Sequence, residues 1–106
     1  MVENRYPIKF TPIAMDDLEE IYRYISEELC AENTAADLLN QIESNIMRIS
    51  GFPCSGSYLT DEYLCSKGYR RIIVDSYITF YIVDEFTQQA VIMRILHGKR
   101  KYEDLL

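Results

Sequence analysis

The first half of the chain alternates between a short apolar segment and two stretches with helical periodicity. Residues 6–10 alternate in polarity and carry strand-forming side chains, which predicts a short strand. From residue 12 to residue 29, apolar side chains recur at steps of three and four, which predicts a helix with one buried stripe. Thr11 followed by Pro12 is typical of a helix start. The stripe consists of Ala14, Leu18, Ile21, Ile25 and Leu29.

A second helix is predicted from Thr34 to about Gly51. Thr34 is a suitable N-cap, and Asp37 follows at the position of a capping-box acid. Gly51 and Pro53 are typical of a helix end. The short link between the two predicted helices favours an antiparallel hairpin, whose apolar stripes need a common surface to cover. The second stripe consists of Leu38, Leu39, Ile42, Ile46 and Ile49.

The second half of the chain predicts that surface as a β-sheet. Segments 69–74, 77–83 and 90–96 are rich in Ile, Val, Tyr and Phe and are separated by short polar turns. Residues 51–68 contain Pro, Gly and Ser and predict a long irregular loop. The order strand, helix, helix, strand, strand, strand predicts an α+β fold. In this fold a helical hairpin packs on one face of a mostly antiparallel sheet.

Length and composition limit the classes of protein to which the chain can belong. With 106 residues, of which 48% are hydrophobic, we expect one domain over residues 1–106 and exclude intrinsic disorder. No apolar run is long enough to cross a membrane and no apolar signal core is present, so we expect a cytoplasmic protein without a membrane partner. The three cysteines and one histidine lack disulfide or metal-site spacing, so we expect no metal and no cofactor.

Charge is divided unevenly along the chain. The net charge of −6 belongs to residues 1–53, which contain ten Asp and Glu against four Lys and Arg, whereas residues 54–106 contain seven of each. Such an acidic protein repels a polyanion, which argues against diffuse nucleic-acid binding. The segment from His97 to Lys101 is a local basic cluster and a candidate contact surface.

Several short motifs occur together, in order, along nearly the whole chain. They are Thr11-Pro-Ile-Ala14, Asp17-Leu18, Tyr24-Ile25, Ala35-Ala36, Phe52-Pro53-x-x-Gly56, Gly68-Tyr69-Arg70-Arg71, Phe80-Tyr81-x-x-Asp84-Glu85 and Arg94-Ile95-x-His97-Gly98-x-Arg100. As a set they resemble the RelE/ParE toxins of type II toxin-antitoxin systems. The resemblance implies a small bacterial toxin that a cognate antitoxin binds and silences.

The resembled family has two kinds of activity. Members similar to RelE or YoeB are ribonucleases that cut messenger RNA, usually on the ribosome. Members similar to ParE instead bind DNA gyrase and block replication. An inactive relative that only binds the antitoxin is a third possibility.

A ribonuclease would need a base for the ribose 2′-hydroxyl, an acid for the leaving oxygen, and cations for the phosphate. The catalytic candidates are His97, Arg94, Arg70 and Tyr102. Arg94 and either Arg70 or Arg71 would hold the phosphate, and His97 or Tyr102 would donate the proton. Arg70 and Arg71 point to opposite faces of a strand, so only one can serve a given site. Arg94 and His97 share a site only if the strand bends or ends between them.

Two features favour the ParE type of activity over RNA cleavage. Ribonuclease members generally carry loop lysines or a loop glutamate as the base. Residues 51–66 contain no Lys or Arg, and Asp61 and Glu62 are their only charges. The net charge also opposes an approach to ribosomal RNA. The sequence of the C-terminal segment from His97 to Tyr102 is similar to that of ParE members. We therefore favour a gyrase-binding toxin, while enzymatic activity as an RNA endonuclease stays open.

In this interpretation, other side chains contact protein partners. The partner-binding candidates are Arg71, Arg100, Lys99, Tyr58 and Tyr63. One of Arg70 and Arg71 is expected to pair with the acidic first half. The antitoxin is expected to form a hetero-oligomer with the toxin through apolar contacts around the sheet edge and the hairpin, because an acidic toxin does not attract an acidic antitoxin.

Overall fold

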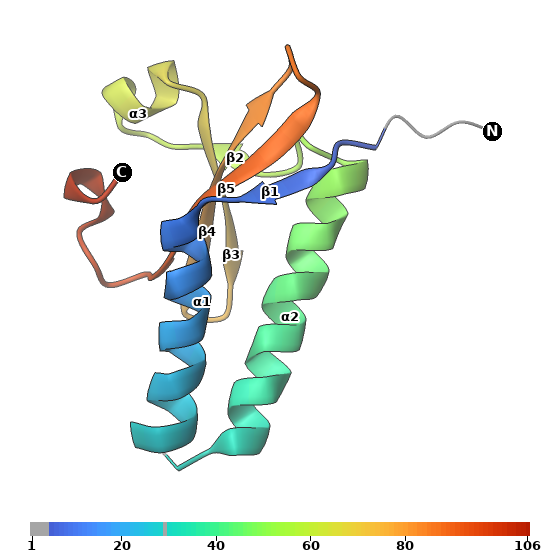
Figure 1. Ribbon diagram of the computed structural model, residues 1–106. Helices are drawn as coiled ribbons and strands as arrows, with labels where there is room; N and C mark the ends of the chain where they lie inside the picture. Colours follow the sequence, from blue (N-terminus) through green and yellow to red (C-terminus); the bar gives the residue numbers. More distant parts are fainter. Residues whose placement is uncertain (1–4, 29) are drawn as a thin grey trace.

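A five-stranded sheet forms the centre of the computed structural model, which describes residues 5–28 and 30–106 (Figure 1). The strands are β1 (Ile8–Phe10), β2 (Ser57–Tyr58), β3 (Tyr69–Val74), β4 (Tyr77–Asp84) and β5 (Gln89–His97). Their spatial order is β1-β5-β4-β3-β2. β1 runs parallel to β5 and the other neighbours are antiparallel, which confirms the predicted, mostly antiparallel sheet.

Two long helices cover one face of this sheet and confirm the predicted hairpin (Figure 1). The first, α1 (Pro12–Arg23), continues into a π-helical turn, η1 (Tyr24–Glu28), and α2 (Glu32–Gly51) returns in the opposite direction. The apolar stripes meet the inner face of the sheet in one hydrophobic core. Its fully buried side chains include Ala14, Ala35, Ile42, Ile49, Tyr81 and Ile92. Because truncation of a buried Ile costs about 2–5 kcal/mol, this contact stabilises both layers.

The outer face of the sheet is also partly covered, which corrects the expectation of an irregular segment at residues 51–68. This segment contains β2 and a short helix, α3 (Glu62–Ser66), which Asp61 caps by accepting a hydrogen bond from the Leu64 amide at 3.0 Å. Elements of two and five residues are too short to show a periodic pattern. α3 and the C-terminal segment with its 3₁₀ turn, η2 (Tyr102–Asp104), supply side chains to a second cluster. Its members include Leu59, Leu64, Tyr69, Phe80, Leu96 and Tyr102.

The helix ends around the hairpin link differ from the sequence prediction. α2 begins at Glu32 instead of after Thr34, and Ala31 precedes it without a side-chain cap. Cys30 adopts a left-handed φ of 52°, and the Ala31 amide donates to the Ile25 carbonyl at 3.1 Å, so backbone contacts close the link. A side-chain cap at Thr34 is therefore not required. Leu29, the last member of the predicted first stripe, lies outside the described residues.

A β-bulge re-aims the side chains in the second half of β5. Tyr81 pairs with Ile92 whereas Phe80 pairs with Arg94, so Met93 is the additional residue. After the bulge, Arg94 shares the outer face with Phe80, and His97 pairs with Tyr77 on the inner, helix-covered face. The two predicted catalytic residues therefore leave β5 on opposite faces.

Replacement of Thr11 by alanine is expected to lower the free energy of unfolding by about 1–2 kcal/mol. The Thr11 hydroxyl accepts from the Ala14 amide at 3.1 Å and donates to the Met93 carbonyl at 3.0 Å, so it links the start of α1 to the bulge. Urea denaturation measures the loss. Thr11→Ser keeps both bonds and is expected to remain close to wild type, and an equal loss in both variants would contradict the capping role.

Candidate functional site

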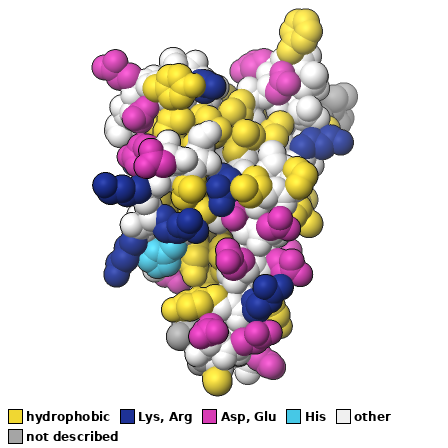
Figure 2. Space-filling model, turned by 60° about the vertical axis from the view of Figure 1, so that its left-hand side comes forward, with side chains coloured by type: hydrophobic (Ala, Val, Ile, Leu, Met, Phe, Trp, Pro, Cys, Tyr) yellow, Lys and Arg dark blue, Asp and Glu magenta, His cyan; other side chains and the backbone are white. Residues whose placement is uncertain are grey.

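A cleft of about 700 Å³ opens between the helical hairpin and the C-terminal end of β5. Its walls are largely apolar, and the charged residues Asp17, Glu20, Asp75 and Arg100 also line it. The residues that line it include Ile21, Tyr24, Leu38, Tyr77, His97 and Arg100. Figure 2 shows the only histidine beside Lys and Arg side chains, with hydrophobic and acidic surface adjacent to it. The cleft therefore combines an apolar floor with charges of both signs.

Three local features place side chains around this cleft. The π-helical turn η1 adds an extra residue to the helical repeat and brings Tyr24 and Ile25 to the cleft wall. Asp75, with a left-handed φ of 57°, forms the tight β3–β4 turn with Ser76. The Ser76 carbonyl accepts from the Gly98 amide at 2.8 Å, so this turn also fixes where the basic segment leaves β5.

His97 is partly exposed at this cleft and is held by two contacts. Its Nδ1 accepts a hydrogen bond from the Lys99 amide at 3.1 Å. Its ring meets the Tyr77 ring edge-on, with centroids 5.2 Å apart and an interplanar angle of 80°. Since Nδ1 is an acceptor, the neutral imidazole carries its proton on Nε2. These two contacts fix the orientation of the side chain.

Arg94 is engaged in a nearly buried ion pair with Asp17 of α1. Arg94 Nε lies 2.8 Å from Asp17 Oδ2 and Nη2 lies 3.0 Å from Oδ1, with side-chain exposures of 12% and 7%. Asp17 Oδ2 also accepts from the Ile95 amide at 3.0 Å. Hydrogen bonding to Asp17 raises the pKa of Arg94. This bidentate pair fastens α1 to the part of β5 that extends beyond β1.

Tyr102 and the basic segment have different environments. The Tyr102 ring packs at 4.8 Å on Phe80, inside the outer-face cluster. Lys99 and Arg100 are exposed, and Arg100 lines the cleft. Arg94 Nη1 also donates to the Leu105 carbonyl at 3.4 Å, so the C-terminal turn contacts the ion pair. Of these residues, Arg100 is the one that shares the cleft with His97.

Arg70 and Arg71 point to opposite faces of β3, as the sequence predicts. Arg70 pairs with Tyr81 of the inner face and Arg71 with Phe80 of the outer face. Arg70 Nη1 donates to the Gly56 carbonyl at 2.7 Å and the Cys54 carbonyl at 3.3 Å, and its guanidinium lies 3.9 Å from the centre of the Tyr58 ring.

These contacts correct the expectation that Arg70 or Arg71 pairs with the acidic first half. Among the described side chains, the ion pair that joins the two halves is the one between Arg94 and Asp17. Arg70 instead holds the segment between α2 and β2 through backbone carbonyls. Asp17 lies on α1, which packs mainly against β5, whereas α2 contacts both β3 and β5.

The two tyrosines that were predicted to contact partners are both exposed. Tyr58 on β2 is 52% exposed and Tyr63 on α3 is 65% exposed. The Lys67 ammonium lies 5.0 Å from the centre of the Tyr63 ring, and a hydrogen bond to Tyr63 raises the pKa of Lys67. Both rings are accessible, but they lie on the β2–α3 side of the sheet and do not line the cleft.

The structure thus brings together only some of the residues that the sequence singled out. His97 and Arg100 line the same cleft. Arg70 and His97 belong to different rows of the sheet. Their partners Tyr81 and Tyr77 are four residues apart on β4, roughly 13 Å along the strand.

Sequence reasoning missed Asp17, Tyr24 and Tyr77 as residues of this site. Asp17 is buried between Ala14 and Ile21, at the spacing of the inward stripe of α1. An acid at a buried stripe position requires a partner, and this spacing was the available signal. The π-helical turn that places Tyr24 has no comparable signature in the sequence.

Two kinds of feature are absent from the described residues. Within residues 5–28 and 30–106, no group of three or more His, Cys, Asp or Glu side chains is arranged to hold a metal ion. In the same described segments, no helix has the length and apolar character required to cross a membrane.

Solved structures define the class of this fold. A chain of the chromosomal ParDE TA system from P. aeruginosa matches with a TM-score of 0.73 and 18% identity, covering 92% of this chain and 100% of that chain. A chain of the toxin-antitoxin complex RelBE2 from Mycobacterium tuberculosis matches with a TM-score of 0.63 and 22% identity, covering 88% of this chain and 91% of that chain. The fold is therefore that of the RelE/ParE toxins.

The family follows from a match to the sequence itself. The family model described as the ParE toxin of type II toxin-antitoxin system, parDE, matches residues 8–102. The chain belongs to this family of toxins. No curated protein matches the chain.

Proposed function

We propose that this toxin arrests growth by binding DNA gyrase and that a cognate antitoxin neutralises it by binding the same chain. The observation that carries the proposal is the placement of the four residues available for RNA cleavage. Arg94 is bonded to Asp17, Arg70 to backbone carbonyls, and Tyr102 packs on Phe80. Cleavage requires a base, an acid and cations around one phosphate. Here both arginines are engaged by other groups, and Arg70 lies in a row of the sheet remote from His97.

The cleft beside His97 supports a protein partner. Its apolar residues offer area that a protein side chain can bury, and His97 and Arg100 offer donors at the rim. The net charge of −6 disfavours an approach to RNA, whose phosphates would be repelled by the acidic helices. Binding to a protein therefore fits both the shape and the charge of this surface.

An open strand edge supports the antitoxin part of the proposal. β2 pairs with β3 only at Arg70 and Arg71. Among the described residues, no strand pairs with the remaining part of that edge of β3, which runs to Val74. An extended segment of an antitoxin can add to such an edge through backbone hydrogen bonds. Affinity that rests on apolar burial and backbone bonds is expected to depend weakly on salt.

Substitution of His97 is expected to have a small effect on toxicity. In a gyrase-binding toxin His97 contributes contact area, so His97→Phe, which keeps a ring against Tyr77, is expected to inhibit supercoiling by purified gyrase within about threefold of wild type. Loss of a general acid in a nuclease would instead lower the rate by about 10²–10⁴. Supercoiling and messenger RNA cleavage are measured side by side, and RNA cleavage by wild type that His97→Phe abolishes would contradict the proposal.

A further inference from the structure

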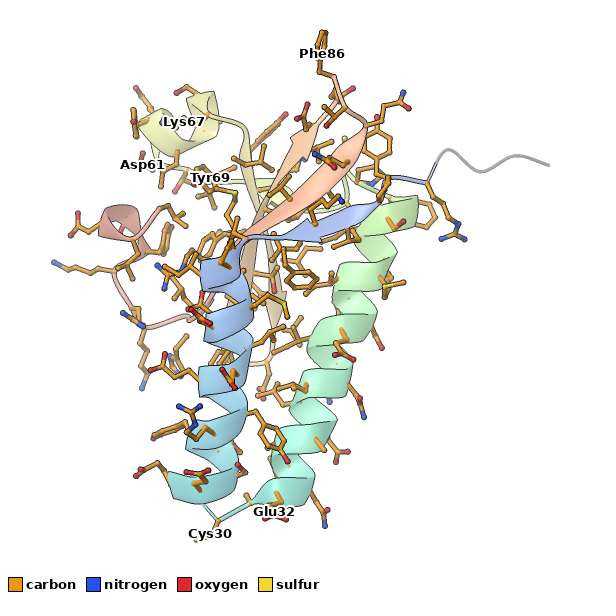
Figure 3. All side chains as sticks on the ribbon, in the orientation of Figure 1. Cys30, Glu32, Asp61, Lys67, Tyr69 and Phe86 are labelled. Carbon is orange, nitrogen blue, oxygen red and sulfur yellow. The ribbon has the colours of Figure 1, made fainter. Side chains whose placement is uncertain are left out.

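The tip of the β4–β5 hairpin presents an aromatic side chain to solvent. Phe86 is 99% exposed, which is more than any other large hydrophobic side chain in the described part of the chain. Figure 3 shows it at the apex of the hairpin, pointing away from the rest of the molecule. It lies outside both hydrophobic clusters of the described residues. Exposure of a whole phenyl ring forgoes the stabilisation that burial gives, so this residue adds nothing evident to folding.

The loop that carries Phe86 is held in one shape. Asp84 Oδ1 accepts hydrogen bonds from the amides of Phe86 at 3.0 Å and Thr87 at 3.2 Å. Bonds from Thr87 and Phe86 also lower the pKa of Asp84, so its carboxylate remains charged and able to accept. Gln88 takes a left-handed φ of 56° and closes the turn. A ring on a preorganised loop loses little conformational entropy when it binds.

The arms of the hairpin provide a rigid support. β4 and β5 contain eight and nine residues, and each has a hydrogen-bonded neighbour on both sides in the sheet. In Figure 1 the tip projects beyond β1 and α2. A partner can therefore approach the ring without contacting the helices.

The charges at the tip indicate the chemistry of the partner. Asp84 and Glu85 precede Phe86, and no Lys or Arg occurs between Asp84 and Gln89. β1 is the neighbour of β5, and its only cation is Lys9. Lys9 pairs with Val91, two residues after the start of β5. An acidic loop repels nucleic-acid phosphates and anionic membranes. The complementary surface is an apolar protein pocket with Lys or Arg at its rim.

We propose that Phe86 is the anchor by which this toxin docks into an apolar, cation-rimmed pocket of its protein target. This inference rests on the proposed function, because it assigns a contact residue for that target. The tip and His97 occupy opposite ends of β5, whose terminal residues are eight positions apart, roughly 26 Å along the strand. The anchor is therefore distinct from the cleft beside His97.

Equilibrium binding to purified gyrase, with supercoiling inhibition as a second readout, tests the anchor. Phe86→Ala is expected to weaken binding by about tenfold or more, as for an aromatic side chain that fills a pocket. Phe86→Leu, which keeps apolar volume, is expected to recover most of the loss. Phe52→Ala removes a 68% exposed phenyl ring elsewhere and is the matched control, expected within about twofold of wild type. Thermal unfolding checks that all three variants fold.

The charged rim has its own variant. Glu85→Lys reverses the charge beside the ring and is expected to weaken binding by slowing association, with a smaller effect at high salt. If Glu85→Lys weakens binding equally at low and high salt, the proposal that cations surround the pocket is overturned.

The outcomes separate the anchor from the proposed function. If wild type and Phe86→Ala bind gyrase equally, the anchor is overturned and gyrase stands as the target. If Phe86→Ala weakens binding of the antitoxin but not of gyrase, the assignment of the partner is overturned. If wild type does not bind gyrase at all, the proposed function fails, and the anchor for that target fails with it.

Discussion

Replacing Asp17 with alanine is expected to lower the free energy of unfolding by about 4 kcal/mol, the largest single effect that we predict. The substitution leaves the Arg94 guanidinium, whose side chain is only 12% exposed, without its bidentate partner, and it removes the acceptor of the Ile95 amide. An unpaired charge and an unpaired amide would then remain where water has little access. Denaturant unfolding measures the loss, and the melting temperature is expected to fall by more than about 15 °C.

Two further variants identify the ion pair as the cause. Asp16→Ala removes the neighbouring carboxylate of α1, which is exposed, and is expected to change stability by less than about 0.5 kcal/mol. Asp17→Ala combined with Arg94→Met removes both charges and is expected to recover part of the loss. Arg94→Met is also measured alone. If the loss of stability in the double variant equals the sum of the losses in Asp17→Ala and Arg94→Met, the two residues are not coupled.

The ion pair between Asp17 and Arg94 bears on function as well as on stability. A guanidinium fastened to Asp17 and to the Leu105 carbonyl serves to hold α1, β5 and the C-terminal turn together. Binding of phosphate by the same group would require it to leave a nearly buried carboxylate. We therefore expect Arg94 to be a structural residue of this toxin.

Replacing Gly56 with alanine is expected to lower the free energy of unfolding by about 3 kcal/mol, the second largest effect that we predict. A Cβ at this position would lie 2.6 Å from the Tyr81 hydroxyl oxygen and 2.7 Å from the Arg71 carbonyl oxygen, both too close. The Gly56 amide donates to the Tyr81 hydroxyl at 2.8 Å, and that hydroxyl donates to the Pro53 carbonyl at 2.8 Å. The substitution therefore forces apart the segment that Tyr81 and Arg70 hold against the sheet.

The chain offers a matched glycine as the control. Gly51 is the last residue of α2, and the nearest atom to an added Cβ is a side-chain atom 3.6 Å away. Gly51→Ala is expected to be neutral or to stabilise by up to about 1 kcal/mol, because alanine favours the helix. Unfolding of both variants is compared in denaturant. A Gly56→Ala protein as stable as Gly51→Ala would contradict the close packing at Tyr81.

The long elements could be predicted from the sequence because each carries a periodic signal. The predicted segments 69–74, 77–83 and 90–96 correspond closely to β3, β4 and β5, and the Thr11 cap lies where it was expected. β2 and α3 could not be predicted, since two and five residues show no period and their positions depend on contacts with β3 and the outer-face cluster.

The candidate site was less predictable than the fold. His97 and Arg100 were identified from the basic segment, but their relation to Tyr24 and Leu38 depends on the π-helical turn and on the way the hairpin packs against β5. The bulge at Met93 determines the face of the sheet on which Arg94 lies, and no residue type in β5 predicts this bulge. Asp17 was predictable in principle, because an acid on a buried stripe requires a partner.

The order in which DNA and protein synthesis stop, after this chain alone is induced in bacteria, distinguishes a gyrase-binding toxin from a ribonuclease. Cells are pulse-labelled for both processes, with and without the antitoxin. A toxin that binds gyrase stops DNA synthesis first, and the antitoxin restores it. If protein synthesis stops first, the target is messenger RNA or the ribosome, and the toxin does not act by binding gyrase.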